Sequence, residues 1–358
     1  MFKAPKLFVT LSVAVVLLLS LFACSNPIIQ TPATTAPHPP RLTPDAAIMA
    51  DGYVLPMKTW APANKTANKA AGKAANQATN QAAAVVLALH GFNDYSNAFA
   101  ASAHIFADNL IVTYAIDQRG FGTTEQNGIW AGTPTLQTDL VTTLTLLCEK
   151  HAGLPVFVLG ESMGGAVILS AMQQLQPTCI RGVILSAPAV WGWQAMPWWQ
   201  TVPLRLLAHT LPELTVTGEG LEIHPSDNIE MLRALGRDPL VIKETRIDAI
   251  YGLTDLMDAA MQNSAALTMP ALILYGEHDE IIPADAFCAM LNKLPDRAAS
   301  QWRLLLYPNG YHMLSRDLQG ERVIRDMVAW IHDQGAALPS GQEVVPGASR
   351  LAAVSVCD

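Results

Sequence analysis

Short, almost continuous apolar runs recur through the middle of the chain, and stretches with helical periodicity separate them. A strand buried on both faces gives such a run, because neither face meets water. Strands and helices that alternate in this way predict an α/β fold with a doubly wound, mostly parallel sheet. An antiparallel pair at 47–49 and 53–60, joined by an Asp51-Gly52 turn, is expected to open it. The remaining expected strands are 85–90, 110–117, 156–160, 183–188, 271–276 and 302–308.

Helices are expected where apolar residues recur three or four positions apart. This spacing runs through 99–110, through 136–147 behind Pro134, and through 323–331. A further helix is expected at 166–175, directly after a glycine-rich turn and before Pro177. These segments lie between the expected strands, as a doubly wound sheet requires.

The segment 189–265 interrupts the alternation, because it has apolar helical patterns but no convincing strand. It is expected to form a helical cap, inserted after the sixth strand, over a core built from 46–188 and 266–334. Four tryptophans between 191 and 199 either face an apolar substrate or seat the cap on the core. The pattern leaves both uses open.

Three further segments have compositions that do not support a core. Residues 24–45 are rich in Pro and Thr, which predicts an extended tether. Residues 61–84 have almost no large apolar side chain and are expected to be a low-complexity insertion in a surface loop. Residues 335–358 are expected to be a loose C-terminal tail.

The N-terminus has the pattern of an export signal. Lys3 and Lys6 precede an uncharged apolar stretch at 7–23. Residues 21–24 (LFAC) resemble a bacterial lipobox, so 1–23 are expected to be a lipoprotein-type signal peptide and Cys24 the lipidated residue. The expected location is the bacterial cell envelope, facing the periplasm. Phe22 is larger than usual there, so an uncleaved anchor and a soluble exported form remain alternatives.

Charge and cysteine usage narrow the classes of partner. The chain has 22 Lys and Arg against 30 Asp and Glu, a net charge of −8, and no basic cluster that could bind nucleic acid. The cysteines beyond Cys24 show neither metal-ligand spacing nor a CxxC motif, so buried thiols are expected. No metal and no obligate protein partner are expected. These four cysteines are Cys148, Cys179, Cys288 and Cys357.

Ser162 is the strongest candidate for a nucleophile. It lies in the motif GESMGG (160–165), between an apolar run and an expected helix. A nucleophile elbow needs this strand-turn-helix setting, with glycines where side chains would collide. A plain turn with a solvated serine is the alternative at this motif alone.

A serine hydroxyl needs a base to take its proton and an acid to orient that base. His312 follows the last expected strand, and Asp279 follows the strand before it. The order Ser162, Asp279, His312 is that of an α/β-hydrolase triad. Asp117 is the competing carboxylate, for which bracing of a loop is favoured. His278 beside Asp279 has no third ligand at metal spacing.

The tetrahedral intermediate of acyl transfer needs two N–H donors for its oxyanion. The backbone N–H of Met163, directly after the serine, is expected to be one of them. The other is expected from Phe92, in the loop that follows the strand at 85–90. His90 is expected to be structural in that loop.

With these residues placed, the sequence resembles the monoacylglycerol lipase and lysophospholipase branch of the α/β-hydrolase superfamily. The resemblance covers roughly 47–334. It implies the α/β-hydrolase fold, the triad and oxyanion residues above, no cofactor, and a cap that admits an acyl chain. Asn93, Asp94, Tyr95 and Glu161 depart from residues frequent in that branch, which leaves the head-group preference open. The motifs that carry the resemblance are HGFNDYS (90–96), DQRGFGTT (117–124), GESMGG (160–165), LYGEHDEIIP (274–283) and YPNGYHMLSRD (307–317).

Three functions fit these residues. The first is hydrolysis of a small lipid or ester, such as a monoacylglycerol or lysophospholipid, through an acyl-enzyme on Ser162. The second is an aminopeptidase on the same triad, which would need cap carboxylates to hold a substrate ammonium. The third is a non-catalytic envelope lipoprotein that binds an apolar ligand. The cap carboxylates available are Glu213, Glu219, Glu222 and Glu230.

Overall fold

The computed structural model describes residues 26–33, 37–63, 82–175, 178–296, 301–344 and 354–357. The expected signal peptide at 1–23, Cys24 and most of the expected insertion at 61–84 lie outside these residues. The insertion connects two strands that lie on either side of a third one and both pair with it.

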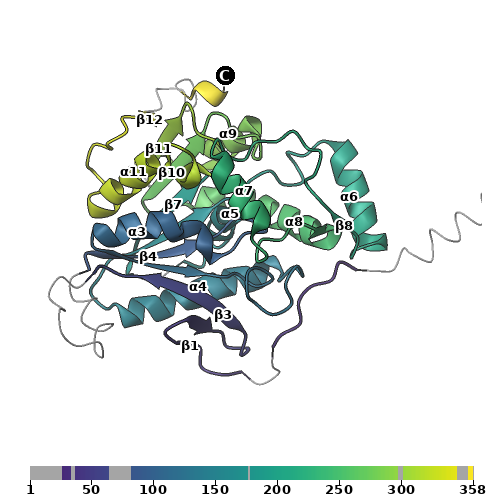
Figure 1. The fold of residues 1–358 in the computed structure, drawn as a ribbon, viewed down its shortest axis with the longest axis horizontal. Helices are drawn as coiled ribbons and strands as arrows, with labels where there is room; N and C mark the ends of the chain where they lie inside the picture. The colour runs from purple at the N-terminus through teal and green to yellow at the C-terminus, as the bar shows by residue number, and fades with distance from the viewer. Residues whose placement is uncertain are drawn as a thin grey trace, which may run out of the picture.

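The described residues contain a ten-stranded sheet in the order β1-β2-β3-β5-β4-β6-β7-β10-β11-β12 (Figure 1). Its six central strands are parallel, and antiparallel strands flank them on both sides. Every residue of β4, β5, β6 and β10 is buried, as continuous apolar runs predict. The bounds are β1 Arg41–Leu42, β2 Ala46–Ile48, β3 Val54–Trp60, β4 Ala84–Leu89, β5 Ile111–Ile116, β6 Val156–Glu161, β7 Ile180–Ser186, β10 Ala271–Gly276, β11 Trp302–Tyr307 and β12 Glu343–Val344.

Helices pack on both faces of the sheet, which confirms the doubly wound α/β fold. On one face α3 (Ala100–Asp108) and α11 (Gly320–His332) bury Phe106 and Trp330. On the other lie α4 (Thr133–Lys150), α5 (Met163–Ser170) and α9 (Ala284–Lys293). Helix α3 ends before Leu110, which has a positive φ of 61° and is exposed.

The cap segment follows β7 and is mostly helical, with two differences from expectation. It contains α6 (Trp198–Thr210) and α7 (Ile229–Arg237), but also a short antiparallel pair, β8 (Thr215–Val216) with β9 (Thr245–Arg246). The long helix α8 (Ile247–Asn263) packs on α5 and buries Leu256 and Ala260 in the main core. The cap therefore ends near Arg246 rather than at 265. No helix among the described residues combines the length and apolar composition that crossing a bilayer requires.

The expectation of an extended tether at 24–45 is wrong for its described residues. Gln30 donates its backbone N–H to the carbonyl of Trp130 at 2.9 Å, and Ile29 forms a β-bridge with Trp130. Farther along, β1 pairs with β2. These backbone groups find partners on the fold, so the described residues are attached to it at Ile29, Gln30 and β1. We call residues 26–33 the N-terminal strap.

The expected loose tail and buried thiols are also corrected. Strand β12 pairs with β11, and Val354 is fully buried in the core. A disulfide joins Cys288 on α9 to Cys357 in the 3₁₀ turn η5 (Ser355–Cys357), and another joins Cys148 to Cys179. The Cα atoms of each pair are 5.7 and 6.0 Å apart, within the range that a disulfide spans. The cysteines are cross-links, because the fold brings residues 69 and 31 positions apart into contact.

Candidate active site

Ser162 occupies a strained turn between β6 and α5. Its φ of 52° and ψ of −113° lie outside the regions that a residue with a side chain normally adopts. The backbone around it is fixed, because its N–H donates to Ser186 and its carbonyl accepts from Ala166 and Ala189, each at 3.0 Å. Strain of this kind persists only where the surroundings impose it, and it is concentrated at functional sites.

Glycines make this turn sterically possible. A Cβ on Gly160 would lie 2.5 Å from the backbone of Gly164, and a Cβ on Gly164 would collide with the backbone oxygen of Leu89. The second contact brings α5 against the end of β4. The loop carrying Phe92 leaves the sheet at that point.

His312 and Asp279 meet at the same edge of the sheet, beyond the ends of β11 and β10. His312 Nδ1 is 2.8 Å from Asp279 Oδ2, and both side chains are buried. Asp279 Oδ1 accepts the backbone N–H groups of Ile281 at 2.8 Å and Ile282 at 2.9 Å. A carboxylate can only accept, so Nδ1 carries the proton and Nε2 is the basic nitrogen.

The surroundings raise the pKa of His312. Burial works in the opposite direction, because it penalises the charged imidazolium, but the charge and the hydrogen bond of Asp279 outweigh it. Glu161 adds to the rise and Arg316 opposes it. The imidazole is therefore a stronger base than an unperturbed histidine.

A cavity of about 340 Å³ joins the expected site residues. Ser162, His312 and Phe92 all line it, and Met163 follows Ser162 as the first residue of α5. Asp279 lies behind His312 rather than in the cavity wall. Most of the remaining wall is apolar. It comes from the cap, from α8, from the loop 277–283 that carries Asp279 (the acid loop) and from the loop of His312: Ala189, Trp191, Met196, Pro225, Ile250, Leu253, Met257, Ile281, Ile282 and Met313.

His90 is structural, as expected. Its Nε2 accepts the backbone N–H of Gln118 at 3.0 Å, so its Nδ1 carries the proton and donates to the carbonyl of Gly91 at 2.8 Å. Burial lowers its pKa, which keeps the ring neutral. The ring thus holds the loop from which Phe92 reaches the cavity.

A buried ion-pair network beside Ser162 was not predicted from the sequence. Arg316 donates to Asp94 Oδ2 at 2.7 Å and to Glu161 Oε1, and all three residues line the cavity. They lie in the motifs HGFNDYS, GESMGG and YHMLSRD, so proximity to the candidate catalytic residues was an available signal. The network connects the loop after β4, the end of β6 and the segment after His312 through one guanidinium.

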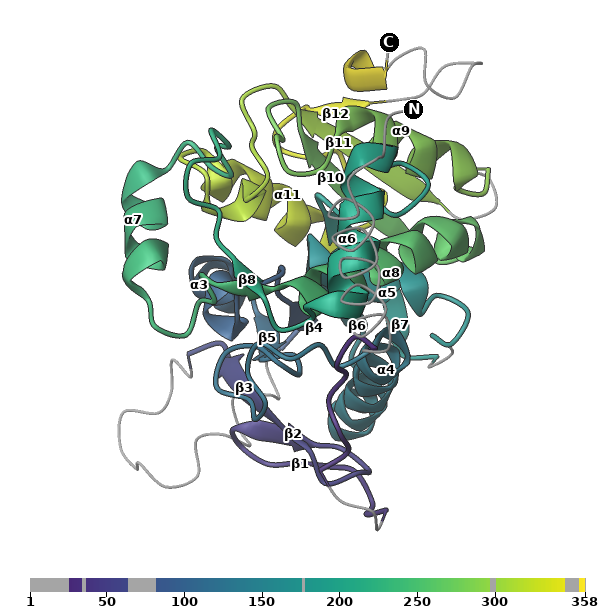
Figure 2. The ribbon, with the colours of Figure 1, turned by 90° about the vertical axis from the view of Figure 1, so that its right-hand side faces the viewer.

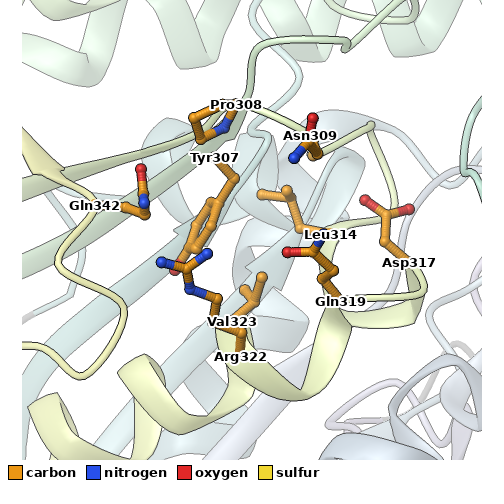
Figure 3. A pocket seen from close by; sticks show the side chains of 10 residues that line it. Tyr307, Pro308, Asn309, Leu314, Asp317, Gln319, Arg322, Val323 and Gln342 are labelled. Carbon is orange, nitrogen blue, oxygen red and sulfur yellow. The ribbon is translucent and has the colours of Figure 1, made fainter.

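Asp317 fixes the loop that carries His312. It accepts the N–H of Tyr311 at 2.8 Å and the hydroxyl of Ser226 in the cap at 2.6 Å. Burial raises its pKa to about 6, although both hydrogen bonds oppose the rise. Figure 3 shows Asp317 and Leu314 beside a second cavity, of about 150 Å³, bounded by Tyr307 and by Val323 on α11. This cavity lies behind the His312 loop and includes none of the expected catalytic residues.

The competing candidates have structural roles. Asp117 accepts from the backbone of Ser96 and Thr123, each at 2.9 Å, which braces its loop as expected. Two other carboxylates near Asp279 also have partners: Glu277 accepts from Ser355, and Glu280 accepts from the backbone of His224. Within the described residues, no cluster of three His, Cys, Asp or Glu side chains could hold a metal ion.

Comparison with known proteins points to one group of enzymes. Residues 80–319 match the family model described as "Serine aminopeptidase, S33". A monoacylglycerol lipase of Mycolicibacterium smegmatis is 29% identical over 254 residues, which cover 69% of this chain and 87% of that protein. A monoglyceride lipase of Mus musculus is 25% identical over 302 residues, which cover 82% and 92%.

Solved structures show the same fold. A soluble variant of monoglyceride lipase from Saccharomyces cerevisiae, in complex with a substrate analogue, has a TM-score of 0.64 and 22% identity over 86% of this chain and 98% of that one. A monoacylglycerol lipase from Paleococcus ferrophilus has a TM-score of 0.60 and 19% identity over 78% and 99%. The fold is therefore the α/β-hydrolase fold expected from the sequence.

Proposed function

Because this chain belongs to the serine aminopeptidase S33 family and is a carboxylic-ester hydrolase, we propose that it cleaves esters of apolar acyl groups with Ser162 as nucleophile. One observation supports this most strongly. Ser162 lies in a strained strand-to-helix turn, on the wall of the same apolar cavity as a histidine bound to a buried aspartate. A plain turn would need neither the strain nor the buried partners.

The proposed reaction follows from the protonation states of these groups. His312 Nε2 takes the proton of the Ser162 hydroxyl as the oxygen attacks the ester carbonyl. Asp279 holds the imidazole in this tautomer and stabilises the imidazolium that forms. The N–H groups of Phe92 and Met163 stabilise the oxyanion. His312 then protonates the leaving alcohol. In the second half of the reaction, His312 takes a proton from water as the water attacks the acyl carbon, and it returns this proton to Ser162 as the acid leaves.

The proposed substrate is a monoacylglycerol, with a lysophospholipid as the second choice. The apolar wall of the cavity suits one acyl chain, and relatives that bear the name monoacylglycerol lipase support a glycerol ester. The carboxylates of Asp94 and Glu161 share one arginine, so the polar end of the cavity carries a net negative charge. A neutral glycerol group suits this end better than a phosphate does.

An aminopeptidase activity has less support. It would need a carboxylate to bind a substrate ammonium, but the two cavity carboxylates already bind Arg316. Among the described residues, none of the four cap glutamates lines the cavity. Glu213 pairs with Arg246 and Glu230 pairs with Arg233. Faster turnover of aminoacyl amides than of acyl esters would overturn the ester preference.

The proposal is tested by activity and by covalent labelling. The purified protein should release fatty acid from monoacylglycerol and react with a fluorophosphonate probe, and Ser162→Ala should abolish both. Ser102→Ala is a matched control, since Ser102 is also buried but lies on α3, outside the cavity. Undiminished labelling of Ser162→Ala would show that another serine is the nucleophile. If the folded wild type does not react with the fluorophosphonate probe, the result would favour the alternative that the protein binds a ligand without catalysis.

We also propose that the chain is exported and held at the bacterial envelope, facing the periplasm, by lipid on Cys24. Two disulfides support an oxidising compartment, since they are rare in proteins kept in the cytosol. Mass spectrometry of the mature N-terminus tests the anchor. A diacylglyceryl group on Cys24 is the expected result, lost in Cys24→Ser. An intact N-terminus that starts at Met1 would instead show that the apolar segment is retained as an uncleaved anchor.

A further inference from the structure

The outer face of helix α6 is apolar although it is exposed. Trp199, Val202 and Leu206 follow one another at helical spacing and are 59%, 57% and 55% exposed. Trp198 beside them is 76% exposed. The outer face of a surface helix is normally polar, because it meets water. A contiguous apolar patch of this kind marks a surface that binds something.

The other side of α6 already holds the helix in place. Thr201, Leu204 and Ala208 are buried, and Leu204 and Ala208 pack with Ile247 at the start of α8. Trp193, the preceding cap tryptophan, contacts Tyr251 and donates to Asp255. Trp198 and Trp199 therefore do not seat the cap. They also do not line the active-site cavity. Figure 2 shows α6 on the outside of the molecule, facing the viewer.

The charge of helix α6 differs in sign from that of the whole chain. The protein has a net charge of −8, yet no Asp or Glu occurs between Glu161 and Glu213. Helix α6 itself contains Arg205 and His209 and no acid. Helix α6 therefore brings no carboxylate of its own to an anionic lipid leaflet, and its exposed Arg205 is attracted to one.

The N-terminal strap places the expected anchor beside the same helix. Asn26 and Ile29 line a cavity of about 470 Å³ together with His209 of α6 and Tyr251 of α8. Ile28 also donates its N–H to Asp248 at the start of α8, at 3.3 Å. The strap reaches α6 in both views of the ribbon (Figures 1 and 2). Two peptide units separate Asn26 from Cys24, so a lipid on Cys24 begins within about 8 Å of Asn26.

We propose that the outer face of α6 docks into the membrane to which the N-terminus is anchored. Tryptophan suits the boundary between head groups and acyl chains, and a helix with an apolar face lies there in the plane of the bilayer. The strap and α6 together give the enzyme one orientation on the membrane. Met196, which lines the active-site cavity, lies two residues before Trp198, so the docked face borders the cavity wall. The proposal rests on the anchorage proposed above and not on the reaction.

Tryptophan fluorescence tests the docking directly. The eight tryptophans all lie at or beyond residue 60, so none belongs to the anchor segment. The full chain is reconstituted into phosphatidylcholine and phosphatidylglycerol vesicles, and the vesicle-bound protein is isolated by flotation. Lipids brominated near the head of the acyl chain should quench its fluorescence, because bromine quenches only tryptophans that it touches. The double variant Trp198→Phe, Trp199→Phe should lose at least half of this quenching.

Trp193→Phe is the matched control, because Trp193 is in the same cap but packs against Tyr251. It should keep the quenching of the wild type. Equal quenching of the wild type and the double variant would overturn the proposal, as would a vesicle-bound wild type that is not quenched. Failure of the proposed anchorage would be distinguished from failure of the docking, because an unanchored protein would not float with the vesicles. Equal thermal unfolding midpoints establish that the variants are folded.

Discussion

At the scale of single residues, the hydrogen bond from His312 to Asp279 is expected to set the pH dependence of the proposed reaction. The general base must be neutral to accept the serine proton. Burial alone would lower the pKa of His312, but Asp279 raises it above the 6.5 of an ordinary histidine. We therefore expect kcat/KM for a soluble ester to fall as the pH falls, with an acid limb centred above pH 6.5. Initial rates between pH 5 and 9 check this.

Asp279→Asn provides the matching variant. The amide still accepts from Ile281 and Ile282, but it removes the negative charge that raises the pKa of His312. Its NH₂ group can also turn the imidazole into the wrong tautomer. We expect kcat to fall about 10⁴-fold, and the acid limb of the residual activity to move to lower pH. If the acid limb does not move in this variant, a group other than His312 is responsible for it.

The sequence could group Ser162, Asp279 and His312 as one candidate site because each directly follows a recognisable buried strand. Ser162, Asp279 and His312 could be found from strand order alone, since parallel strands end at one edge of a sheet. Arg316 could not be paired in this way. Its partners Glu161 and Asp94 are 155 and 222 positions away, and nothing in local spacing connects them. Such a network depends on how three distant segments meet, which is a property of the folded chain.

At the scale of elements, the turn between β6 and α5 depends on Gly164. A side chain there would collide with the backbone oxygen of Leu89, which cannot move without displacing β4 and the loop of Phe92. We expect Gly164→Ala to lower the free energy of unfolding by about 1–3 kcal/mol, as overpacking does, and to lower kcat. Gly236→Ala on α7 is the control, because a Cβ there meets nothing within 4 Å. If denaturant unfolding shows that Gly164→Ala is as stable as Gly236→Ala, the predicted collision with Leu89 is wrong.

The pattern of apolar residues predicted the helices and strands that are long enough for the pattern to repeat. The six central strands and helix α4 lie close to their expected positions. Strands β1, β8, β9 and β12 have two residues each, too few for an alternation to be visible. Their pairing depends on a neighbouring strand that offers free backbone groups. The wrong prediction for the strap has the same cause. Its Pro-rich composition predicted a tether, but its backbone pairs with Trp130, which only the folded chain brings close.

At the scale of the whole molecule, segments at both ends of the chain are tied to the α/β core. The strap binds near α6 and α8, while the C-terminal residues 354–357 bind α9 and the acid loop. Cysteine spacing could not predict the two cross-links, because separations of 31 and 69 residues fit no local motif. Which thiols pair is decided by which Cα atoms the fold brings within about 6 Å.

The cross-link between Cys288 and Cys357 has the larger expected effect on stability. It closes a loop of 69 residues, for which chain entropy in the unfolded state gives a stabilisation of about 4 kcal/mol. It also holds Val354 in the core and Ser355 against Glu277, two residues before Asp279. The double variant Cys288→Ser, Cys357→Ser should therefore unfold at lower denaturant than Cys148→Ser, Cys179→Ser, because it releases these contacts in addition to the loop. It should also lose more ester turnover, since the acid loop loses a support. Equal unfolding midpoints and equal turnover in the two variants would mean that the C-terminal residues contribute only through chain entropy.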